Sequence, residues 1–279
     1  MATATPQLPL FDTSPAPPPE PGRTVLEFFA GVGLARIGFE QAGWRVVWAN
    51  DYDPMKRRQY EGHFGPSPHL SGEDIHAIAD RLANGPDEVP DEVPDALLAH
   101  ASFPCTDLSL AGGRRGLNAG ESSAFWGFYT LLEKLGERRP PLVLLENVTG
   151  LISSHGGQDF RATAAALCEL GYAVDALVLD AAHFVPQSRP RLFIVGKPAR
   201  EGGAPAGPAL RTAPPARQEP RPPVASVIRP QKLLDAIAAN RDLAWNLADL
   251  PEPPPYGAAH LEDILDDPPD NSPQWWSGE

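Results

Sequence analysis

The sequence has few cysteines and no long apolar run. Cys105 and Cys168 are the only cysteines among 279 residues, and two thiols cannot build a disulfide framework. No apolar stretch is long enough to span a bilayer, and the chain starts without the basic and apolar regions of a secretory signal. We therefore expect a cytoplasmic protein that has no membrane partner.

Basic residues are also scarce, since 23 Lys and Arg stand against 36 Asp and Glu and give a formal charge of −13. Residues 242–279 contain nine acidic residues and no Lys or Arg, so this segment would repel phosphate. The basic residues gather in short clusters at residues 56–58, 114–115, 138–139 and 189–200. The overall charge therefore lowers the expected non-specific affinity for nucleic acid, while a local basic patch can still hold DNA.

Proline is abundant, with 34 residues that cluster toward the two ends. This distribution predicts a Pro-rich tail at residues 1–22, a folded catalytic body at residues 23–197, a Pro-rich linker at residues 198–223 and an acidic C-terminal segment at residues 224–279. We expect both ends to be loosely ordered around the folded body.

Within the body, short apolar runs alternate with segments of helical periodicity. We predict strands at residues 24–29, 45–49, 96–101, 141–145, 173–179 and 191–195, and helices at residues 34–42, 54–63, 122–136, 158–170 and 229–239. Wholly apolar strands are typical of parallel sheets, because helices cover both faces of such sheets. The sequence therefore predicts an α/β fold with a doubly wound, mostly parallel sheet.

A glycine turn, Phe29-Ala30-Gly31-Val32-Gly33, follows the first predicted strand and opens a helix. Glycine lets the backbone approach a ligand, and the helix N-terminus offers free N–H groups. Asp51 ends the second strand, where a carboxylate suits the hydroxyls of a ribose, and Asp74 could accept a hydrogen bond from the amine of an adenine. Each feature alone could be a tight turn or a helix cap, but together they describe one nucleoside pocket.

Cys105 follows Pro104 at the carboxyl end of a predicted strand, which is where ligands bind in open α/β sheets. The loop around it is polar and contains glycine, an environment typical of a reactive thiol. Cys168 lies instead in an Ala- and Leu-rich helix, where core packing is expected.

Charged residues also flank the later strands. Glu146 ends an apolar strand, where an unpaired charge is costly, and this favours a role in proton transfer; a helix cap is the alternative. Arg189 and Arg191 precede the final strand at a spacing of two, which can place both guanidinium groups on one face. Such groups hold phosphates or the carbonyl oxygen of a base, and a solvated basic edge is the alternative.

Read in order, these segments resemble the DNA cytosine C5-methyltransferase family. The resemblance rests on EFFAGVGLARIGFEQAG, WANDYDP, GEDI, FPCTDLSLAGGRRGLNAGESSAF, LLENVTGL and the run from GYAV to HFVPQSRPRLFIVG. Their order and spacing agree with the family from Thr24 to Gly196, and the PC, ENV and QxRxR elements are each specific. The resemblance implies the Rossmann-like fold of S-adenosylmethionine-dependent methyltransferases.

The resemblance also implies a role for each matched residue. Cys105 would attack C6 of a cytosine that is flipped out of the DNA duplex. Glu146 would protonate or hydrogen-bond N3, and Arg191 would hold O2, with Arg189 supporting the loop or a phosphate. S-adenosylmethionine is the implied cofactor, and its implied contacts are Phe29, Ala30, Gly31, Gly33, Asp51, Asp74 and Pro104. The implied contacts to DNA are Ser109, Arg114, Arg115 and Gln187, and no metal is implied.

The sequence departs from the family after Gly196. The family continues with a target-recognition region, then a late helix and a Gly-Asn element that completes the cofactor pocket, and none of these is recognisable here. Residues 261–279 resemble the stretch that leads into the recognition region. We therefore expect a truncated, split or reduced methyltransferase, which a complementary polypeptide carrying the recognition region could complete.

Three functions remain open at this point. The first is DNA methylation in a restriction–modification or phage-defence system. The second is methylation of transfer RNA, because a subfamily that acts on transfer RNA is similar. That subfamily tends to have threonine at the position of Ser109, so Ser109 favours DNA as the substrate. The third is a non-catalytic, cofactor-binding subunit.

The tail contains a separate signal, Gln7-Leu8-Pro9-Leu10-Phe11, which resembles peptides that dock bacterial sliding clamps. A chance apolar patch is the alternative.

Overall fold

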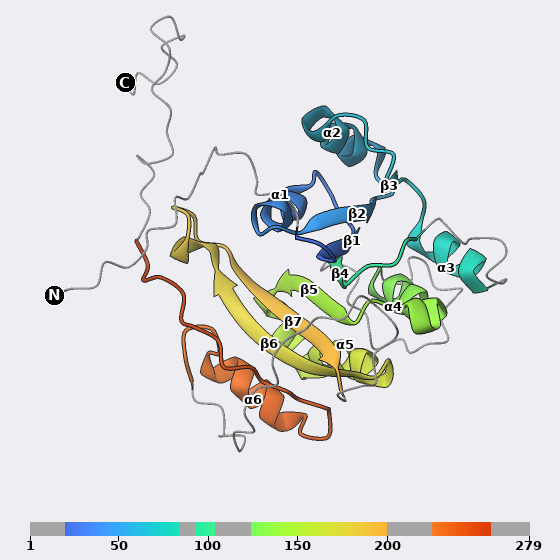
Figure 1. The fold of residues 1–279 in the computed structure, drawn as a ribbon. Coiled ribbons are helices and arrows are strands. Elements are labelled where there is room, and N and C mark those ends of the chain that lie inside the picture. The colour runs from blue at the N-terminus through green and yellow to red at the C-terminus, as the bar shows by residue number, and fades with distance from the viewer. Residues whose placement is uncertain (1–19, 84–92, 104–123, 200–224, 258–279) are drawn as a thin grey trace, which may run out of the picture.

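A seven-stranded sheet forms the centre of the computed structural model, with the strands in the order β3-β2-β1-β4-β5-β7-β6 (Figure 1). The structure describes residues 20–83, 93–103, 124–199 and 225–257. The strands are β1 (Thr24–Phe28), β2 (Arg45–Asn50), β3 (Leu70–Ser71), β4 (Leu98–Ala101), β5 (Leu142–Val148), β6 (Tyr172–Asp180) and β7 (Pro190–Pro198). The α-helices are α1 (Leu34–Gln41), α2 (Pro54–Phe64), α3 (Ile75–Ala83), α4 (Ala124–Leu135), α5 (Gln158–Glu169) and α6 (Gln231–Ala239), and the 3-10 helices are η3 (Gly136–Arg138), η4 (Thr149–Gly157) and η5 (Ala181–His183).

The sheet is mostly parallel, as the sequence predicts. Strands β1 to β5 pair in parallel, whereas β7 runs antiparallel to both of its neighbours, β5 and β6. Two elements, β3 and α3, were not predicted. Strand β5 also runs further than predicted, to Val148, so that Glu146 lies within the strand rather than just beyond it.

Helices cover both faces of the sheet (Figure 1). On one face, Val25 and Leu98 of the sheet pack with Tyr60 of α2 and with the partly buried Phe39 of α1. On the other face, Phe28 packs with Phe128 of α4 and with apolar side chains of α3 and α5. Burial on two faces explains why these strands are almost continuously apolar. No helix in the described ranges has the length and apolar character needed to cross a membrane.

Gly33 lies where α1 begins, close against α2. Its φ of 88° is in the left-handed region, and a Cβ atom there would lie 2.3 Å from a ring carbon of Phe64 and 2.9 Å from a ring carbon of Tyr60. Both the backbone conformation and the lack of space therefore require glycine at this position.

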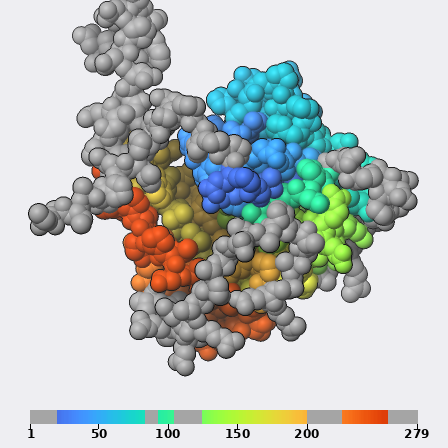
Figure 2. Space-filling view, viewed as in Figure 1, coloured from blue at the N-terminus to red at the C-terminus, as the bar shows by residue number. Residues whose placement is uncertain are grey.

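Residues 225–257 pack against the outer edge of β6, beyond the predicted end of the folded body. The backbone N–H of Val178 donates to the carbonyl of Ile228, and Val174 exchanges backbone hydrogen bonds with Ala244 and Asn246. Figure 2 shows this segment, in orange to red, against the yellow to gold strands. The free edge of β6 is thereby paired, so the expectation of a loosely ordered C-terminal end is wrong for this stretch.

The same segment adds to the core. Leu233 and Ile237 of α6 are buried with the apolar residues on the α5 side of the sheet. Trp245 stacks on Phe160 of α5 with the ring centroids 5.9 Å apart. Arg161 of α5 binds Asp242 at 2.6 Å in an exposed ion pair. The segment is therefore held by apolar contacts as well as by its pairing with β6.

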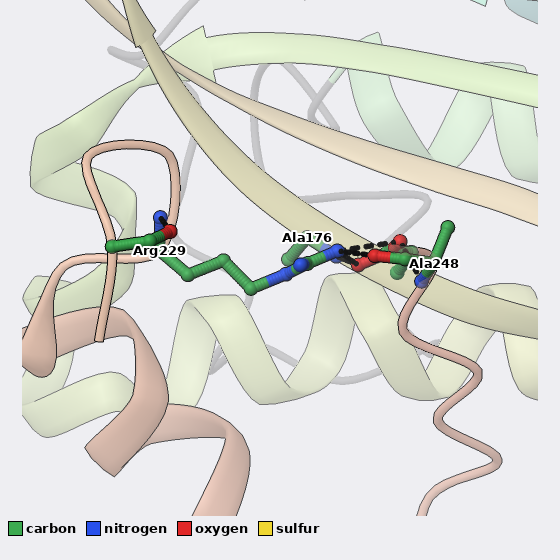
Figure 3. A network of polar contacts seen from close by, with 5 residues as sticks. Ala176, Arg229 and Ala248 are labelled. Carbon is green, nitrogen blue, oxygen red and sulfur yellow. Dashed lines mark hydrogen bonds and ion pairs between the residues drawn. The ribbon is translucent and has the colours of Figure 1, made fainter. Parts of the chain in front are cut away.

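A buried ion pair holds the segment on the opposite face of β6. Nη2 of Arg229 lies 3.0 Å from both carboxylate oxygens of Asp175 and donates to the carbonyl of Ala248. The carboxylate of Asp175 also accepts the backbone N–H groups of Ala176 and Ala248. Figure 3 shows Arg229 extending from the loop before α6 to the point on β6 where these bonds converge.

We predict that Gly33→Ala destabilises the fold, by about 1–3 kcal/mol, because it adds both backbone strain and a clash with α2. The matched control is Gly38→Ala in the same helix, where an added Cβ would meet nothing within 4 Å; it should be neutral or stabilising by about 0.5–1 kcal/mol. Urea unfolding of both variants measures the difference. Equal stabilities would contradict this account of Gly33.

We also predict that Arg229→Ala lowers the free energy of unfolding by about 3 kcal/mol, because the carboxylate of Asp175 is left buried without its counter-charge. The control is Arg161→Ala, which removes the exposed partner of Asp242 and should change stability little. The measurement is urea unfolding followed by circular dichroism. A loss in Arg229→Ala no greater than in the control would argue against a stabilising role of the buried pair.

Candidate functional site

A cavity of about 350 Å³ opens at the carboxyl ends of β1, β2, β4 and β5. Ligands bind at this edge of open α/β sheets, because the loops that follow the strands diverge there. Five residues that the sequence analysis singled out line the cavity, together with six that it did not. The lining residues are Phe29, Asp51, Tyr52, Lys56, Ser102, Phe103, Glu146, Asn147, Val148, Arg189 and Arg191.

The antiparallel direction of β7 brings the two arginines to this edge. Arg191 pairs in register with Val148, the last residue of β5. The beginning of β7 therefore lies beside the ends of the parallel strands, and Arg189, just before β7, also reaches the cavity. A parallel β7 would have placed these arginines at the far edge of the sheet.

Glu146 has a partner on each of its carboxylate oxygens. Nε of Arg191 lies 2.9 Å from Oε1, and each of the two side chains is 20% exposed. The hydroxyl of Ser102 donates to Oε2. The carboxylate is therefore held in one orientation, and the lone pairs that these bonds leave can accept hydrogen bonds from a ligand. The alternative of a helix cap gains no support from these contacts.

Asn147, which follows Glu146, fixes the chain on the other side of the cavity. Its buried amide Nδ2 donates to the carbonyl of Phe103 at 3.1 Å. Phe103 directly precedes Pro104 and Cys105 in the sequence. The end of β5 is thus bonded to the backbone that leads into the segment of the predicted nucleophile.

Asp51 joins the glycine turn to the end of β2. Its Oδ2 accepts the N–H of Gly31 at 2.8 Å, and its Oδ1 accepts the N–H of Asp53 at 2.9 Å. Phe29, at the start of the turn, has a φ of 58°, which is uncommon for a residue with a side chain and costs conformational energy. The glycine turn and the acidic strand end, predicted to form one pocket, are therefore in direct contact.

Tyr52 is a cavity residue that the sequence analysis missed, and Lys56 comes from the basic cluster at residues 56–58. Tyr52 is 68% exposed beside the buried Asp51, and an exposed tyrosine can stack its ring on the flat face of a base. An aromatic residue next to a carboxylate at a strand end is the signal that could have identified Tyr52. Ser102 and Asn147 were given no role either, although Ser102 adjoins the PC element and Asn147 lies within the ENV element.

Asp74 and Gln187 are predicted site residues that lie outside the cavity lining. Asp74 accepts the N–H of His76 at 2.7 Å at the start of α3, which is the geometry of a helix cap. Gln187 is exposed in the turn before β7, where its backbone N–H donates to the carbonyl of Val185. Their implied contacts, to the cofactor and to DNA, remain predictions.

Three more predicted site residues also lie outside the cavity lining, and five lie outside the described residues. Ala30, Gly31 and Gly33 belong to the turn between β1 and α1, but they are not among the cavity-lining residues. The remaining predicted residues lie outside the described residues, and these are Pro104, Cys105, Ser109, Arg114 and Arg115. The clamp-like peptide at residues 7–11 lies outside them as well.

Two buried ionisable groups lie side by side on the neighbouring strands β1 and β4. Glu27 of β1 pairs in register with His100 of β4, and both are buried. Burial raises the pKa of Glu27 to about 8, although Arg36 at the start of α1 opposes this shift. Burial lowers the pKa of His100 to about 4. Near neutral pH both side chains are therefore largely uncharged.

A model of the C-5 cytosine-specific DNA methylase family matches residues 23–227. The chain is also similar to curated proteins. It is 35% identical over 175 residues to the Type II methyltransferase M.Bsp6I of Bacillus sp. (strain RFL6), covering 62% of this chain and 51% of that protein. It is 36% identical over 172 residues to M.NgoBI of Neisseria gonorrhoeae, covering 61% and 49%.

A third similar protein is a DNA-cytosine methyltransferase of Escherichia coli (strain K12), 31% identical over 212 residues, with coverage of 67% and 44%. The chain thus spans about half the length of the curated relatives it matches. Among solved structures, the S. pombe Dnmt2 methyltransferase is similar with a TM-score of 0.50 at 21% identity, covering 64% of this chain and 52% of that one. This likeness concerns the fold alone, and it agrees with the predicted fold class.

The buried Glu27 predicts a pH dependence of stability. Because its pKa rises from 4.5 to about 8 on folding, its contribution is fully present below pH 4.5 and is lost as the pH rises toward 8. The loss is at most about 1.4 kcal/mol for each pH unit in this window. Glu27→Gln, which stays neutral, should therefore gain stability over the wild type between pH 5 and pH 8, measured by urea unfolding.

The control for this comparison is Glu61→Gln, which changes an exposed carboxylate on α2. Its stability difference from the wild type should stay nearly constant over the same pH range. If Glu27→Gln behaved in the same way as this control, the raised pKa of Glu27 would be disproved.

Proposed function

Since the chain belongs to the C-5 cytosine-specific DNA methylase family, we propose that it transfers a methyl group from S-adenosylmethionine to C5 of a cytosine in DNA. One observation carries the proposal. The carboxylate of Glu146 and the guanidinium of Arg191 form an ion pair inside the cavity that Asp51 and Phe29 also line. The bond from Asn147 to Phe103 ties the chain that leads into Pro104 and Cys105 to the same place.

The residues at the ends of β1 and β2 fit a nucleoside-containing cofactor. Asp51 is buried with its carboxylate at the cavity, and each of its oxygens can accept a ribose hydroxyl besides its backbone N–H. The exposed ring of Tyr52 can stack on an adenine. S-adenosylmethionine would supply the electrophilic methyl group there.

At the other end of the cavity, the chain would act on the base. The thiolate of Cys105 adds to C6, and this addition makes C5 nucleophilic. Glu146 supplies a proton or a hydrogen bond to N3, which neutralises the charge pushed into the ring. Arg191 holds O2 with guanidinium N–H groups other than the Nε that binds Glu146. Loss of the C5 proton and of the sulfur–C6 bond then releases the product.

The substrate base has to leave the double helix, because C6 cannot be reached by a thiol inside the stack. Flipping costs a few kcal/mol. Lys56 and Arg189 are basic residues of the cavity and suit the phosphates beside a flipped nucleotide. The predicted contacts of Ser109, Arg114, Arg115 and Gln187 would add to this binding.

DNA is the proposed substrate rather than transfer RNA. Support comes from the curated relatives, of which three are named Type II methyltransferases or DNA-cytosine methyltransferase. Such names also support a role in restriction–modification, and phage defence is a further proposal of the same kind. The likeness to Dnmt2 does not argue for RNA, because at 21% identity it concerns the fold alone.

The further partners are proposed from the sequence alone. One is a complementary polypeptide that carries a region that reads the DNA sequence. The docking of residues 7–11 on a sliding clamp, and the placement of the protein in the cytoplasm, rest on the sequence alone.

The test is covalent trapping with duplex DNA of random sequence that carries 5-fluorocytosine. Fluorine cannot leave as the C5 proton does, so the full chain with S-adenosylmethionine should accumulate an adduct that survives denaturation. Cys105→Ser should abolish the adduct, whereas the matched control Cys168→Ser, in α5, should retain it. Mass spectrometry locates the modified residue. The proposal fails if no base is found on Cys105, even after a polypeptide carrying a recognition region is added.

A further inference from the structure

We propose that Ser102 is a positioning residue for Glu146 and that it makes Oε2 the oxygen that carries the proton to N3 of the cytosine. The proposal rests on the proposed function, because it concerns how Glu146 performs its part of that reaction. It gives a role to Ser102, to which the family resemblance assigned none. The hydroxyl of Ser102 both lines the cavity and donates to Glu146.

The sheet register places Ser102 beside Glu146. Strands β4 and β5 pair in parallel, with His100 opposite Leu144. Two residues further along, Ser102 and Glu146 fall on the same face, because side chains alternate along a strand. The contact between the hydroxyl and the carboxylate thus follows from the sheet itself rather than from a flexible loop.

The backbone on both sides of the hydroxyl is fixed. The N–H of Ser102 donates to the carbonyl of Phe28 in β1. The carbonyl of Phe103, the next residue, accepts the amide of Asn147. A donor on so constrained a backbone loses little entropy when it binds Glu146, so it can hold the carboxylate in the orientation that a base would need.

The two oxygens of Glu146 have partners of different chemistry. Arg191, on Oε1, is always charged and can only donate, so a proton on Oε1 would face a cation. Ser102, on Oε2, has a hydroxyl that donates and accepts, and it can therefore stay bonded whether Oε2 carries a proton or not. Oε2 is therefore the oxygen that can pass a proton to N3.

Protonation of N3 accompanies the attack of the thiolate on C6. As the thiolate of Cys105 forms its bond to C6, the C5–C6 π pair shifts to C4–C5, and the C4–N3 π pair shifts to N3. Before this step, the carboxylate of Glu146 takes up one proton from water on Oε2. N3 then takes that proton, and Glu146 is again a carboxylate held by Ser102 and Arg191. When the sulfur–C6 bond breaks at the end, these shifts reverse and the proton returns to Oε2.

Release of tritium from duplex DNA of random sequence labelled at cytosine C5 tests the proposal. Without cofactor, addition of the thiolate and protonation at N3 still allow the C5 hydrogen to exchange with water. Ser102→Ala should lower kcat for tritium release about tenfold, as expected for the loss of one hydrogen bond to a charged group, with KM unchanged. Ser102→Thr keeps a hydroxyl and should restore most of the rate.

The matched control is Ser153→Ala, which changes an exposed serine of η4 that bonds only with Gly150 and Lys232 among the described residues. It should release tritium at the wild-type rate. The proposal is overturned if Ser102→Ala equals the wild type, or if Ser102→Thr is impaired as much as Ser102→Ala, because bulk rather than the hydroxyl would then matter.

A crystal structure of the Ser102→Ala chain separates this proposal from the proposed function. If neither the wild type nor Cys105→Ser releases tritium, with or without S-adenosylmethionine, methyl transfer by this chain alone is refuted, and the crystal structure decides the role of Ser102. A carboxylate of Glu146 that has turned away from its wild-type orientation, or that occupies two orientations, supports positioning by Ser102. A carboxylate that keeps the wild-type orientation on Arg191 alone overturns it.

Discussion

The ion pair between Glu146 and Arg191 is the interaction on which the site depends, and it exists because one strand of the sheet is reversed. Glu146 emerges from a parallel strand and Arg191 from the beginning of the antiparallel β7. Both charges therefore meet at the edge where β1, β2 and β4 also end. The pair neutralises two groups that would be costly to leave half-buried and unpaired. It also keeps their remaining lone pairs and N–H groups at the cavity.

Much of this site is predictable because each part is encoded locally. The turn after β1 needs residues that tolerate positive φ, and the sequence marks it with Gly31 and Gly33. Asp51 and Glu146 interrupt apolar runs, and such interruptions identify polar residues at strand ends. The doubly wound fold is also predictable from local patterns, because few other folds accommodate wholly apolar strands that alternate with helices. Short local segments of this kind identified five residues that the structure brings to the cavity, and these are Phe29, Asp51, Glu146, Arg189 and Arg191.

The remaining features depend on contacts between distant segments. The bond from Ser102 to Glu146 spans two strands and becomes visible only once their register is known. Asp175 lies in a run of apolar residues, and its partner Arg229 is 54 positions away. No local pattern shows that they meet. The short β3 is defined by its pairing with β2 rather than by any apolar run of its own.

The attachment of residues 225–257 has a consequence for the integrity of the molecule. Their backbone completes the outer edge of β6, their apolar side chains enter the core, and Arg229 is anchored to Asp175. All of these contacts are non-covalent and independent of the connection from β7 to α6. A protease cut in that connection would therefore yield two fragments that remain bound together. Size-exclusion chromatography would still report one particle, although a denaturing gel would separate two bands.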